Sequence, residues 1–398
     1  MTAGFEVWCG LDVGKLSHHA CAVDKEGQRL FDGSLPQDET RLRELFDRLA
    51  RHGRVLVVVD EPNTIGALPV AVAQAMGIEV GYLPGLVMRR AADLHPGEAK
   101  TDARDAWVIA DTARVMPHLL RRLDLGEETL AELGVLVGYD DDLAAEATRV
   151  ANRLRGLLSQ IHPALERLLG PRIHTKAVVA LLSRYGGPAG LAAAGRGRLV
   201  RTVRTANPRG AEKLVDQVLT ALAEQTVTVP GAAAAETVVP RLAVALQTVL
   251  DQRAEIARQV EQVLDAHPLA AVLTSMPGIG VRTAARILVE VGDASTFPSA
   301  AHLAAYAGLA PATRQSGHSI RGEHAPRGGN RRLKSALFLS GFSVLRSDPL
   351  SRAYYDRKRA EGKKHNAAML CLARRRCDVI YAMLKNRTPY QPRIPQAA

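Results

Sequence analysis

Short apolar runs and helical periodicities alternate along the first third of the chain. Residues 5–11 and 18–23 are patterned as strands, and residues 27–32 predict a third strand after the turn at 25–27. A helix, a strand, a helix, a strand and a helix are then predicted for residues 39–51, 55–59, 67–76, 79–83 and 101–115. The N-terminal third is therefore expected to be a mixed α/β domain.

This order of elements indicates a more specific architecture. Three strands followed by helix, strand, helix, strand and helix is the order of an α/β ribonuclease-H-like domain, whose mixed sheet carries acidic residues at adjacent strand ends. We assign residues 1–125 to this domain.

The pattern changes beyond about residue 125, where strand signals stop. Residues 127–169 and 239–263 have the periodicity of long helices, and the stretch 175–230 between them contains breakers typical of a small helical insertion. The two long helices are expected to pair as an antiparallel coiled coil, within the chain or between chains, which would serve dimerisation. We expect a helical region over 126–265, a mainly α-helical C-terminal domain over 266–390 and a loose tail over 391–398.

The charge of the chain is unevenly distributed. Of the net +11, residues 311–398 contribute +14 and the rest −3. Such a surface favours a polyanionic partner, although a solvated basic face is the alternative. The four cysteines lack zinc-site spacing, and neither a signal peptide nor a run of about 18 apolar residues is present. We therefore expect a cytoplasmic protein with reduced thiols and no membrane segment.

Five acidic residues follow the predicted strands and open the last helix of the first domain. Asp12 ends the first strand, Asp60 and Glu61 follow the apolar run 55–59, and Asp102 and Asp105 share one face of a helix that Thr101 can cap. Four such carboxylates would suit Mg²⁺ and phosphodiester cleavage. The alternative is that the two helical aspartates only complement the helix dipole.

The choice between Asp60 and Glu61 stays open, because neighbouring strand residues face opposite sides of a sheet. We favour Asp60, the first acid after the apolar run, and expect the metal ligands to be Asp12, Asp60, Asp102 and Asp105.

A glycine turn between two apolar helices opens the C-terminal domain. The sequence Pro277 to Gly280 resembles a helix-hairpin-helix element, in which Gly278 and Gly280 would expose amides to a DNA phosphate. Arg282, Thr283 and Arg286 beside the turn favour this interpretation over a simple packing turn.

A serine lies among basic, glycine-rich loops further along. Ser316 precedes Gly317, and nearby cations would stabilise a phosphate under attack, so Ser316 is either a nucleophile or a phosphate-binding hydroxyl. Ser319, without a following glycine, and Ser340, within a predicted helix, are less favoured. Further expected nucleic-acid contacts are Arg314, Gly317, Arg327, Asn330, Arg331, Arg332 and Lys334, with Asn330 also able to cap a helix.

These motifs together resemble the DEDD transposases of bacterial insertion sequences, in the family numbered 110. The resemblance spans nearly the whole chain and rests on the motifs at residues 10–15, 100–106, 277–280, 308–311, 316–317 and 329–331. It implies a RuvC-like domain with an Asp-Glu-Asp-Asp metal site, a coiled coil and a C-terminal domain with a catalytic serine. Asp12, Asp102, Asp105 and Ser316 match the family pattern. The second acid departs from it, because Asp60 stands where the family has Glu.

The resemblance further implies a function and its partners. We expect a recombinase that excises and inserts its element with Mg²⁺, or Mn²⁺ in its place, and a transient phosphoserine link at Ser316. Its partners would be double-stranded DNA, a noncoding RNA encoded by the element, and further copies of the chain in a homodimer or homotetramer. The rival hypotheses are a RuvC-like structure-specific endonuclease without a serine intermediate, and a noncatalytic nucleic-acid-binding protein.

Overall fold

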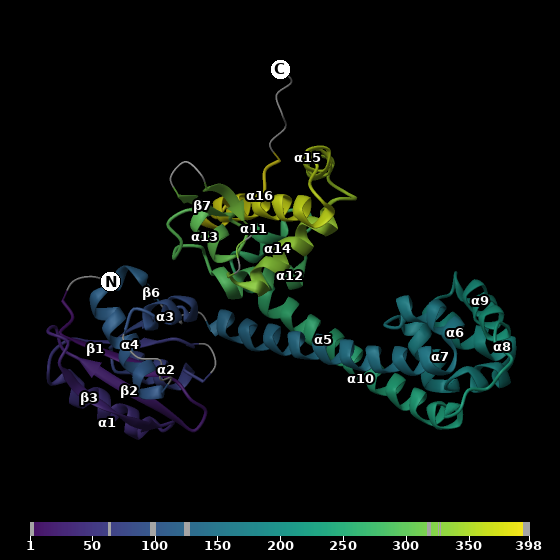
Figure 1. The fold of residues 1–398 in the computed structure, drawn as a ribbon, viewed down its shortest axis with the longest axis horizontal. Helices are drawn as coiled ribbons and strands as arrows, with labels where there is room; N and C mark the ends of the chain where they lie inside the picture. The colour runs from purple at the N-terminus through teal and green to yellow at the C-terminus, as the bar shows by residue number, and fades with distance from the viewer. Residues whose placement is uncertain are drawn as a thin grey trace, which may run out of the picture. The chain divides into compact units, whose positions relative to one another are not determined.

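The computed structural model describes residues 4–62, 65–95, 101–122, 128–316, 320–324, 326 and 328–392. It divides into two compact units. Unit 1 comprises Met1–Gly134 together with His267–Ala398, and unit 2 comprises Val135–Ala266. Each is described on its own below (Figure 1).

The N-terminal part of unit 1 is built on a six-stranded mixed sheet in the order β3-β2-β1-β4-β5-β6. Strands β1 and β4 and strands β4 and β5 are parallel, and the other neighbours are antiparallel. The strands are β1 Val7–Asp12, β2 Ser17–Val23, β3 Arg29–Pro36, β4 Val55–Val59, β5 Glu79–Tyr82 and β6 Arg121–Arg122. This confirms the mixed α/β domain; the expected order of strands and helices is present, with α3 and β6 as additional elements.

Helices cover both faces of this sheet. The helices of this part are α1 Glu39–Ala50, α2 Ala67–Ala75, α3 Gly85–Ala92, α4 Asp102–Val115 and the short 3-10 helix η1 Pro117–Leu119. Helices α1 and α2 pack on one face, over the side chains of Val7, Cys9 and Leu11, whereas α3 and α4 pack on the other face. Burial from both sides explains why β4 is entirely apolar.

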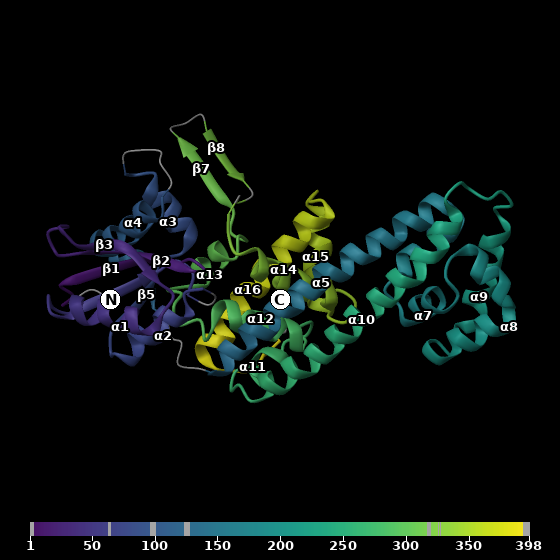
Figure 2. The same ribbon diagram turned by 90° about the horizontal axis from the view of Figure 1, so that it is seen from below.

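The regular elements of unit 2 are all helices among its described residues. Its helices are α5 Glu128–Ile161 from Val135 onward, α6 Pro163–Leu169, η2 Gly170–Arg172, α7 Lys176–Tyr185, α8 Pro188–Ala206, α9 Ala211–Ala223 and α10 Ala232–Asp265. Figures 1 and 2 show α5 and α10 side by side and antiparallel within this unit, and Arg253 of α10 forms an ion pair with Asp140 of α5 (Nε–Oδ1 2.9 Å). The Arg253–Asp140 ion pair thus joins the two long helices within the chain. Helices α7 to α9 lie within residues 175–230, where a small helical insertion was expected, whereas α6 lies in the segment expected to be part of one long helix.

Helix α10 is, among the described residues, the one helix long and apolar enough to cross a membrane by length and composition. Its apolar stretch is interrupted by Glu236, Pro240 and Arg241, and it packs against α7. The Glu236 carboxylate accepts hydrogen bonds from the backbone amides of Gly187 (2.8 Å) and Ala189 (2.7 Å). A long core helix meets the same criterion, so this feature alone does not indicate a membrane span.

The C-terminal part of unit 1 combines helices with one hairpin. The helices are α11 Ala270–Thr274, α12 Val281–Val291, α13 Ala300–Tyr306, α14 Arg331–Val344, α15 Pro349–Ala360 and α16 His365–Asn386. Strands β7 Ala312–Ser316 and β8 Ile320–His324 form an antiparallel hairpin that projects from these helices in Figure 2.

Two expectations about local structure are wrong. Strand signals do not stop at about residue 125, because β7 and β8 form a hairpin over residues 312–324. These strands carry mainly polar and charged residues, so they lack the apolar alternation by which strands are recognised. Helix α3, Gly85–Ala92, lies in a segment for which no element was expected.

Candidate active site and nucleic-acid interface

Asp12 and Asp60 stand at the ends of two adjacent parallel strands. In the register of β1 and β4, Leu11 pairs with Val59, and Asp12 and Asp60 are the next residues along each chain. Because parallel strands end at the same edge of the sheet, the two carboxylates are carried to one place.

The alternation of side chains shows which face of the sheet Asp12 and Asp60 share. On β4, Val55, Val57 and Val59 belong to the core beneath α1 and α2, whereas Leu56 and Val58 pack with α4. Asp60 continues the second set, and Glu61 continues the first. On β1, Asp12 lies on the same face as Gly10, which contacts α4. Both aspartates are therefore on the α4 side.

Helix α4 crosses β1 in very close contact at Gly10. A Cβ atom at Gly10 would lie 2.3 Å from the carbonyl oxygen of Ala106 and 2.5 Å from the amide nitrogen of Ala110, so no side chain fits there. This approach brings the first turn of α4, with Asp102 and Asp105, toward the end of β1. Thr101 caps that turn as expected, since its Oγ1 accepts a hydrogen bond from the amide of Arg104 (3.2 Å).

Asp60 is a partly buried acid that stands beside other acids. Burial, together with the neighbouring charges of Glu61 and Asp105, raises the pKa of the Asp60 carboxyl to about 6. Its Oδ1 atom is buried and has no hydrogen-bond partner among the described residues. A buried oxygen without a donor is costly unless a cation or a proton satisfies it.

The carboxylates share one region but are not drawn together into a ligand cluster. Within the described parts of the chain, no three His, Cys, Asp or Glu side chains are close enough to hold a metal ion. The structure brings Asp60 and Asp105 within electrostatic reach of each other and places Asp12 on the same side. Glu61 is exposed. The orphaned oxygen of Asp60 and the all-oxygen donor set nevertheless fit a hard divalent cation.

The glycine turn between α11 and α12 is held by contacts with two other helices, α14 and α16. Gly278 has a positive φ of 82°, and a Cβ atom there would lie 2.5 Å from the carbonyl oxygen of Ser340 in α14. Ser343 donates a hydrogen bond to the carbonyl of Gly278 (3.1 Å), and Arg376 of α16 donates to that of Pro277 (2.5 Å). The carbonyls of Gly278 and Pro277 are thus bonded to α14 and α16.

The other side of this turn is accessible. Gly280 is exposed and is the N-cap residue of α12, where no side chain caps the helix. Arg282 and Thr283 follow it in the first turn of α12, where at least part of each side chain is exposed. Uncapped amides at a helix N-terminus attract anions.

Arg286, which supported the phosphate interpretation, is turned inward. It is 8% exposed and forms an ion pair with Glu290 one turn later on α12 (3.3 Å). The Glu290 carboxylate also accepts a hydrogen bond from the side-chain amide of Asn330 (2.5 Å), and that same amide group donates to the Tyr306 hydroxyl (2.9 Å). This polar cluster links α12, α13 and α14.

Asn330 caps α14 as expected. Its Oδ1 accepts a hydrogen bond from the amide of Leu333 (2.9 Å), and its own backbone amide donates to the carbonyl of Tyr306 (2.7 Å). Its side-chain groups are thus engaged within the protein. Arg331 and Arg332 in the first turn of α14 are exposed, and Lys334 is half-buried.

Ser316 is the last residue of β7 and pairs in register with Ile320 of β8, so it stands at the tip of the hairpin. Arg314 lies in the same strand opposite Gly322. At the base of the hairpin, Gly329 and Gly308 touch, since a Cβ atom at Gly329 would lie 2.6 Å from the amide nitrogen of Gly308. This contact fixes where the hairpin leaves the helices.

Several residues named from the sequence lie outside the described part of the chain. They are Lys100, Gly317, Ser319 and Arg327.

Sequence reasoning missed the two residues that organise the C-terminal helices most directly, Arg376 and Glu290. Arg376 is 4% exposed, and its Nε donates to Ser340 (2.8 Å). In the sequence it stands in a run of three arginines that is typical of a basic surface. Only the apolar positions around it, among them Leu372 and Ile380, show that position 376 lies on the buried side of α16.

Comparison with protein families gives two matches. Residues 9–163 match the model of the IS110 DEDD transposases, described as a transposase, and residues 270–356 match a model described as transposase of the IS116/IS110/IS902 family.

Relatives of similar length support both matches. The chain is 59% identical to an uncharacterised protein of insertion element IS110 from Streptomyces coelicolor, over 98% of this chain and 96% of the relative. It is 38% identical to an uncharacterised protein of insertion element IS900 from Mycobacterium paratuberculosis, over 98% and 99%. It is 29% identical to the mini-circle putative transposase for IS117 of Streptomyces coelicolor, over 96% and 94%.

Proposed function

Since the chain belongs to the IS116/IS110/IS902 family of insertion-element transposases, we propose that it excises and inserts its element with a RuvC-like metal site and a serine nucleophile. The observation that carries this proposal is the placement of Asp12 and Asp60 at adjacent strand ends, on the face crossed by the helix that bears Asp102 and Asp105. We assign the metal chemistry to residues 1–125 and the serine chemistry to residues 266–390.

Asp12, Asp60, Asp102 and Asp105 would hold Mg²⁺, or Mn²⁺ in its place. A divalent cation bound there supplies charge that polarises a phosphoryl oxygen. The protein contributes the position of the acids. Asp60 is held half-buried beside Asp105, with one oxygen lacking a donor, so its charge is best satisfied by a cation. We assign the second acidic ligand to Asp60 rather than to Glu61, which continues the opposite face of β4.

Ser316 would form the covalent link to DNA. Its hydroxyl oxygen attacks the scissile phosphorus and loses its proton, while the bond from phosphorus to one deoxyribose oxygen breaks and that oxygen takes up a proton. Reversal of the same exchange at a different DNA end rejoins the strand without loss of bond energy. The position of Ser316 at the tip of a projecting hairpin supports this role, because a hairpin tip is accessible to a duplex.

The basic C-terminal part would hold the DNA backbone. We propose that the turn at Gly278 and Gly280 acts as a helix-hairpin-helix phosphate site together with Arg282 and Thr283, since its amides begin α12 without a cap. Further contacts would come from Arg314, Gly317, Arg327, Asn330, Arg331, Arg332 and Lys334. Asn330 would contribute by fixing the start of α14.

The remaining parts of the proposal follow from the family resemblance. A noncoding RNA encoded by the element would choose the DNA sites, and the chain would act as a homodimer or homotetramer. The region 126–265, in which the Arg253–Asp140 ion pair joins α10 to α5, would form the coiled-coil element of that assembly.

The carboxylate assignment is tested by cleavage of the element's DNA in Mg²⁺ with Asp60→Ala and, as matched control, Glu61→Ala. We expect Asp60→Ala to abolish strand cleavage and Glu61→Ala to retain it. Loss of cleavage only with Glu61→Ala would transfer the ligand role to Glu61. Retention of metal-dependent cleavage in both variants would refute the proposed site.

A further inference from the structure

The helical insertion of unit 2 carries a concentration of positive charge that the proposed function does not use. Residues 164–209 contain nine Lys and Arg and one acidic residue, Glu166. Helices α7 and α8 alone, from Lys176 to Ala206, contain six basic residues and no acidic one. The segment lies beyond the two family matches, which cover residues 9–163 and 270–356. Its charge therefore calls for a separate explanation.

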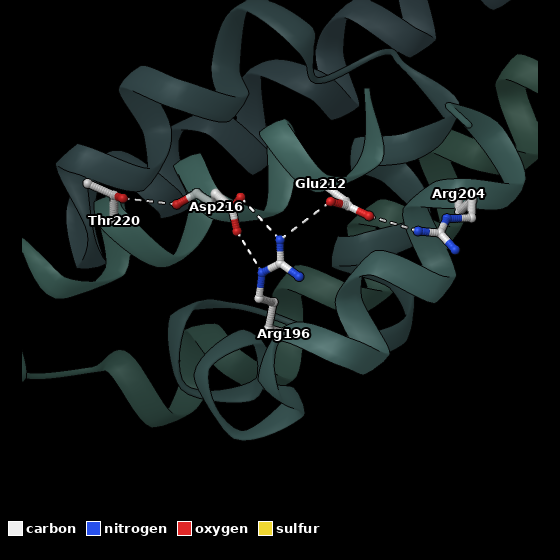
Figure 3. Close-up of polar contacts among 5 residues, drawn as sticks. All are labelled: Arg196, Arg204, Glu212, Asp216 and Thr220. Atoms are coloured by element: carbon white, nitrogen blue, oxygen red, sulfur yellow. Dashed lines mark hydrogen bonds and ion pairs between the residues drawn. The ribbon is translucent and has the colours of Figure 1, made fainter. Parts of the chain in front are cut away.

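One side of α8 is neutralised by the neighbouring helix α9. Figure 3 shows Arg196 between Asp216 and Glu212, with Arg204 bonded to the other oxygen of Glu212. The Arg196–Asp216 contact is 2.8 Å and the Arg204–Glu212 contact 3.0 Å. These two arginines are engaged with carboxylates and leave little net charge on this side.

The other side of α8 and the adjoining end of α7 keep their charge. Arg184, Arg198 and Arg201 are exposed, and none of them has a carboxylate within 4.0 Å among the described residues. Arg198 and Arg201 are three residues apart and so occupy neighbouring positions on one helix face. We call these three residues the arginine face.

Tyr185 joins the two helices beneath this face. The guanidinium of Arg184 lies 5.7 Å from the centre of the Tyr185 ring, and the Tyr185 hydroxyl donates to the carbonyl of Arg198 (3.2 Å). Arg198 itself is anchored, since its guanidinium donates to the carbonyls of Ala193 and Ala194. Glu236, the acid of α10 that reaches the α7–α8 turn, binds backbone amides instead of an arginine. Arg184 and Arg198 are thus held in place by contacts that do not neutralise their charge.

The chemical groups of the arginine face indicate which class of ligand it would bind. Clustered guanidinium groups without carboxylate partners match phosphate oxygens and release counterions when they bind them. Tyr185 is the one aromatic residue between 164 and 209, and its hydroxyl is bonded within the protein. A platform for stacking unpaired bases is therefore absent from this described segment, which favours a duplex backbone. We infer that Arg184, Arg198 and Arg201 form a second DNA-contact surface that binds the phosphate backbone of duplex DNA.

The test compares two pairs of arginines on the same helices. The wild-type chain and two full-length variants are titrated with a DNA duplex of arbitrary sequence in metal-free buffer at several salt concentrations. The first variant is Arg184→Gln/Arg201→Gln, and the second is Arg196→Gln/Arg204→Gln. Both variants lose the same formal charge, so any loss of DNA affinity that comes only from the lower net charge is the same in both. Without metal, the assay does not depend on the carboxylates or on cleavage.

We expect the first variant to bind about tenfold more weakly, with the slope of log affinity against log salt smaller by about 2, because each phosphate contact contributes about one unit of slope. The second variant should bind like the wild type. Equal losses in both variants, or no loss in the first, would overturn the inference. A loss seen with duplex RNA of the same sequence but not with duplex DNA would likewise contradict it.

Discussion

At the scale of single residues, Asp60 is the group whose environment departs furthest from that of a surface carboxylate. Its pKa is raised to about 6 from the ordinary 3.8, mainly by burial. A raised pKa means that the folded chain binds the proton more tightly than the unfolded chain. The stability that this proton contributes is therefore full below about pH 4 and is lost as the pH rises through 6. Each pH unit between the two pKa values corresponds to about 1.4 kcal/mol of this stability.

Asp60→Asn removes this charge without changing the shape of the side chain. In metal-free buffer we expect the variant to be more stable than the wild type at pH 7.5, by roughly 1 to 3 kcal/mol, and equally stable at pH 4. Thermal unfolding across this pH range measures the difference. Added Mg²⁺ should stabilise the wild type more than the variant. The exposed Glu61→Gln is the control, and an identical pH profile for wild type and Asp60→Asn would contradict the account.

A second prediction at the scale of single residues concerns Arg376. Burial lowers the pKa of its guanidinium to about 10, so it remains charged at neutral pH and donates to Ser340 and to the carbonyl of Pro277. Arg376→Met leaves both acceptors without this donor and should destabilise the chain by about 2 to 4 kcal/mol.

Hydrogen exchange gives a local readout of the Arg376 contact. The amides of the turn at 277–280 should exchange faster in Arg376→Met, because a carbonyl that orders the turn is released. Arg374→Met, on the same helix but half-exposed and paired with Asp378, is the control and should leave the turn unchanged. Equal protection of the turn in all three proteins would show that Arg376 does not hold it.

At the scale of elements, the contact between β1 and α4 is the one that positions the acids. Gly10→Ala places a Cβ atom 2.3 Å from the carbonyl of Ala106 and should push α4 away, with a loss of roughly 1 to 3 kcal/mol and of Mg²⁺-dependent cleavage. Gly138→Ala in α5 is the matched change, because nothing lies within 4 Å of its Cβ position. It should stabilise by about 0.5 to 1 kcal/mol. Thermal unfolding midpoints distinguish the two variants. A Gly10→Ala variant as stable as the wild type would mean that α4 is not held at Gly10.

The strands and helices of the first domain could be predicted because their burial gives each of them a regular pattern of apolar and polar residues. The apolar run of β4 is buried on both sides, and the helical periodicity of α1 follows from one buried face. Strands β7 and β8 carry no such pattern, since their pairing follows from backbone hydrogen bonds between polar segments. The hairpin that bears Ser316 was therefore found only in the structure.

The sequence predicted the acids of the candidate site but not their arrangement. It indicated Asp12, Asp60, Asp102 and Asp105, and the proposed preference for Asp60 over Glu61 is now supported by the face of β4 that packs on α4. Likewise, the ion pair of Arg286 with Glu290 and the hydrogen bond of Arg376 with Ser340 became evident only in the structure.

At the scale of the whole molecule, the groups assigned to the proposed chemistry lie in different parts of the sequence. Asp12 and Asp60 follow adjacent strand ends in the N-terminal part, Ser316 ends β7 in the C-terminal part, and helices α7 and α8 of unit 2 carry the arginine face. This distribution suits an enzyme that must grip a long polyanion at several places while it exchanges phosphodiester bonds.

The most direct test mixes the full-length chain, DNA containing the element's ends and the transcribed noncoding flank in Mg²⁺, and searches for a protein-DNA adduct that survives denaturation. We expect the adduct with the wild type and its loss in Ser316→Ala, whereas Ser340→Thr, a buried serine of α14, should retain it. An adduct that persists in Ser316→Ala, or metal-dependent cleavage by the wild type without any adduct, would contradict the serine mechanism and favour a RuvC-like endonuclease.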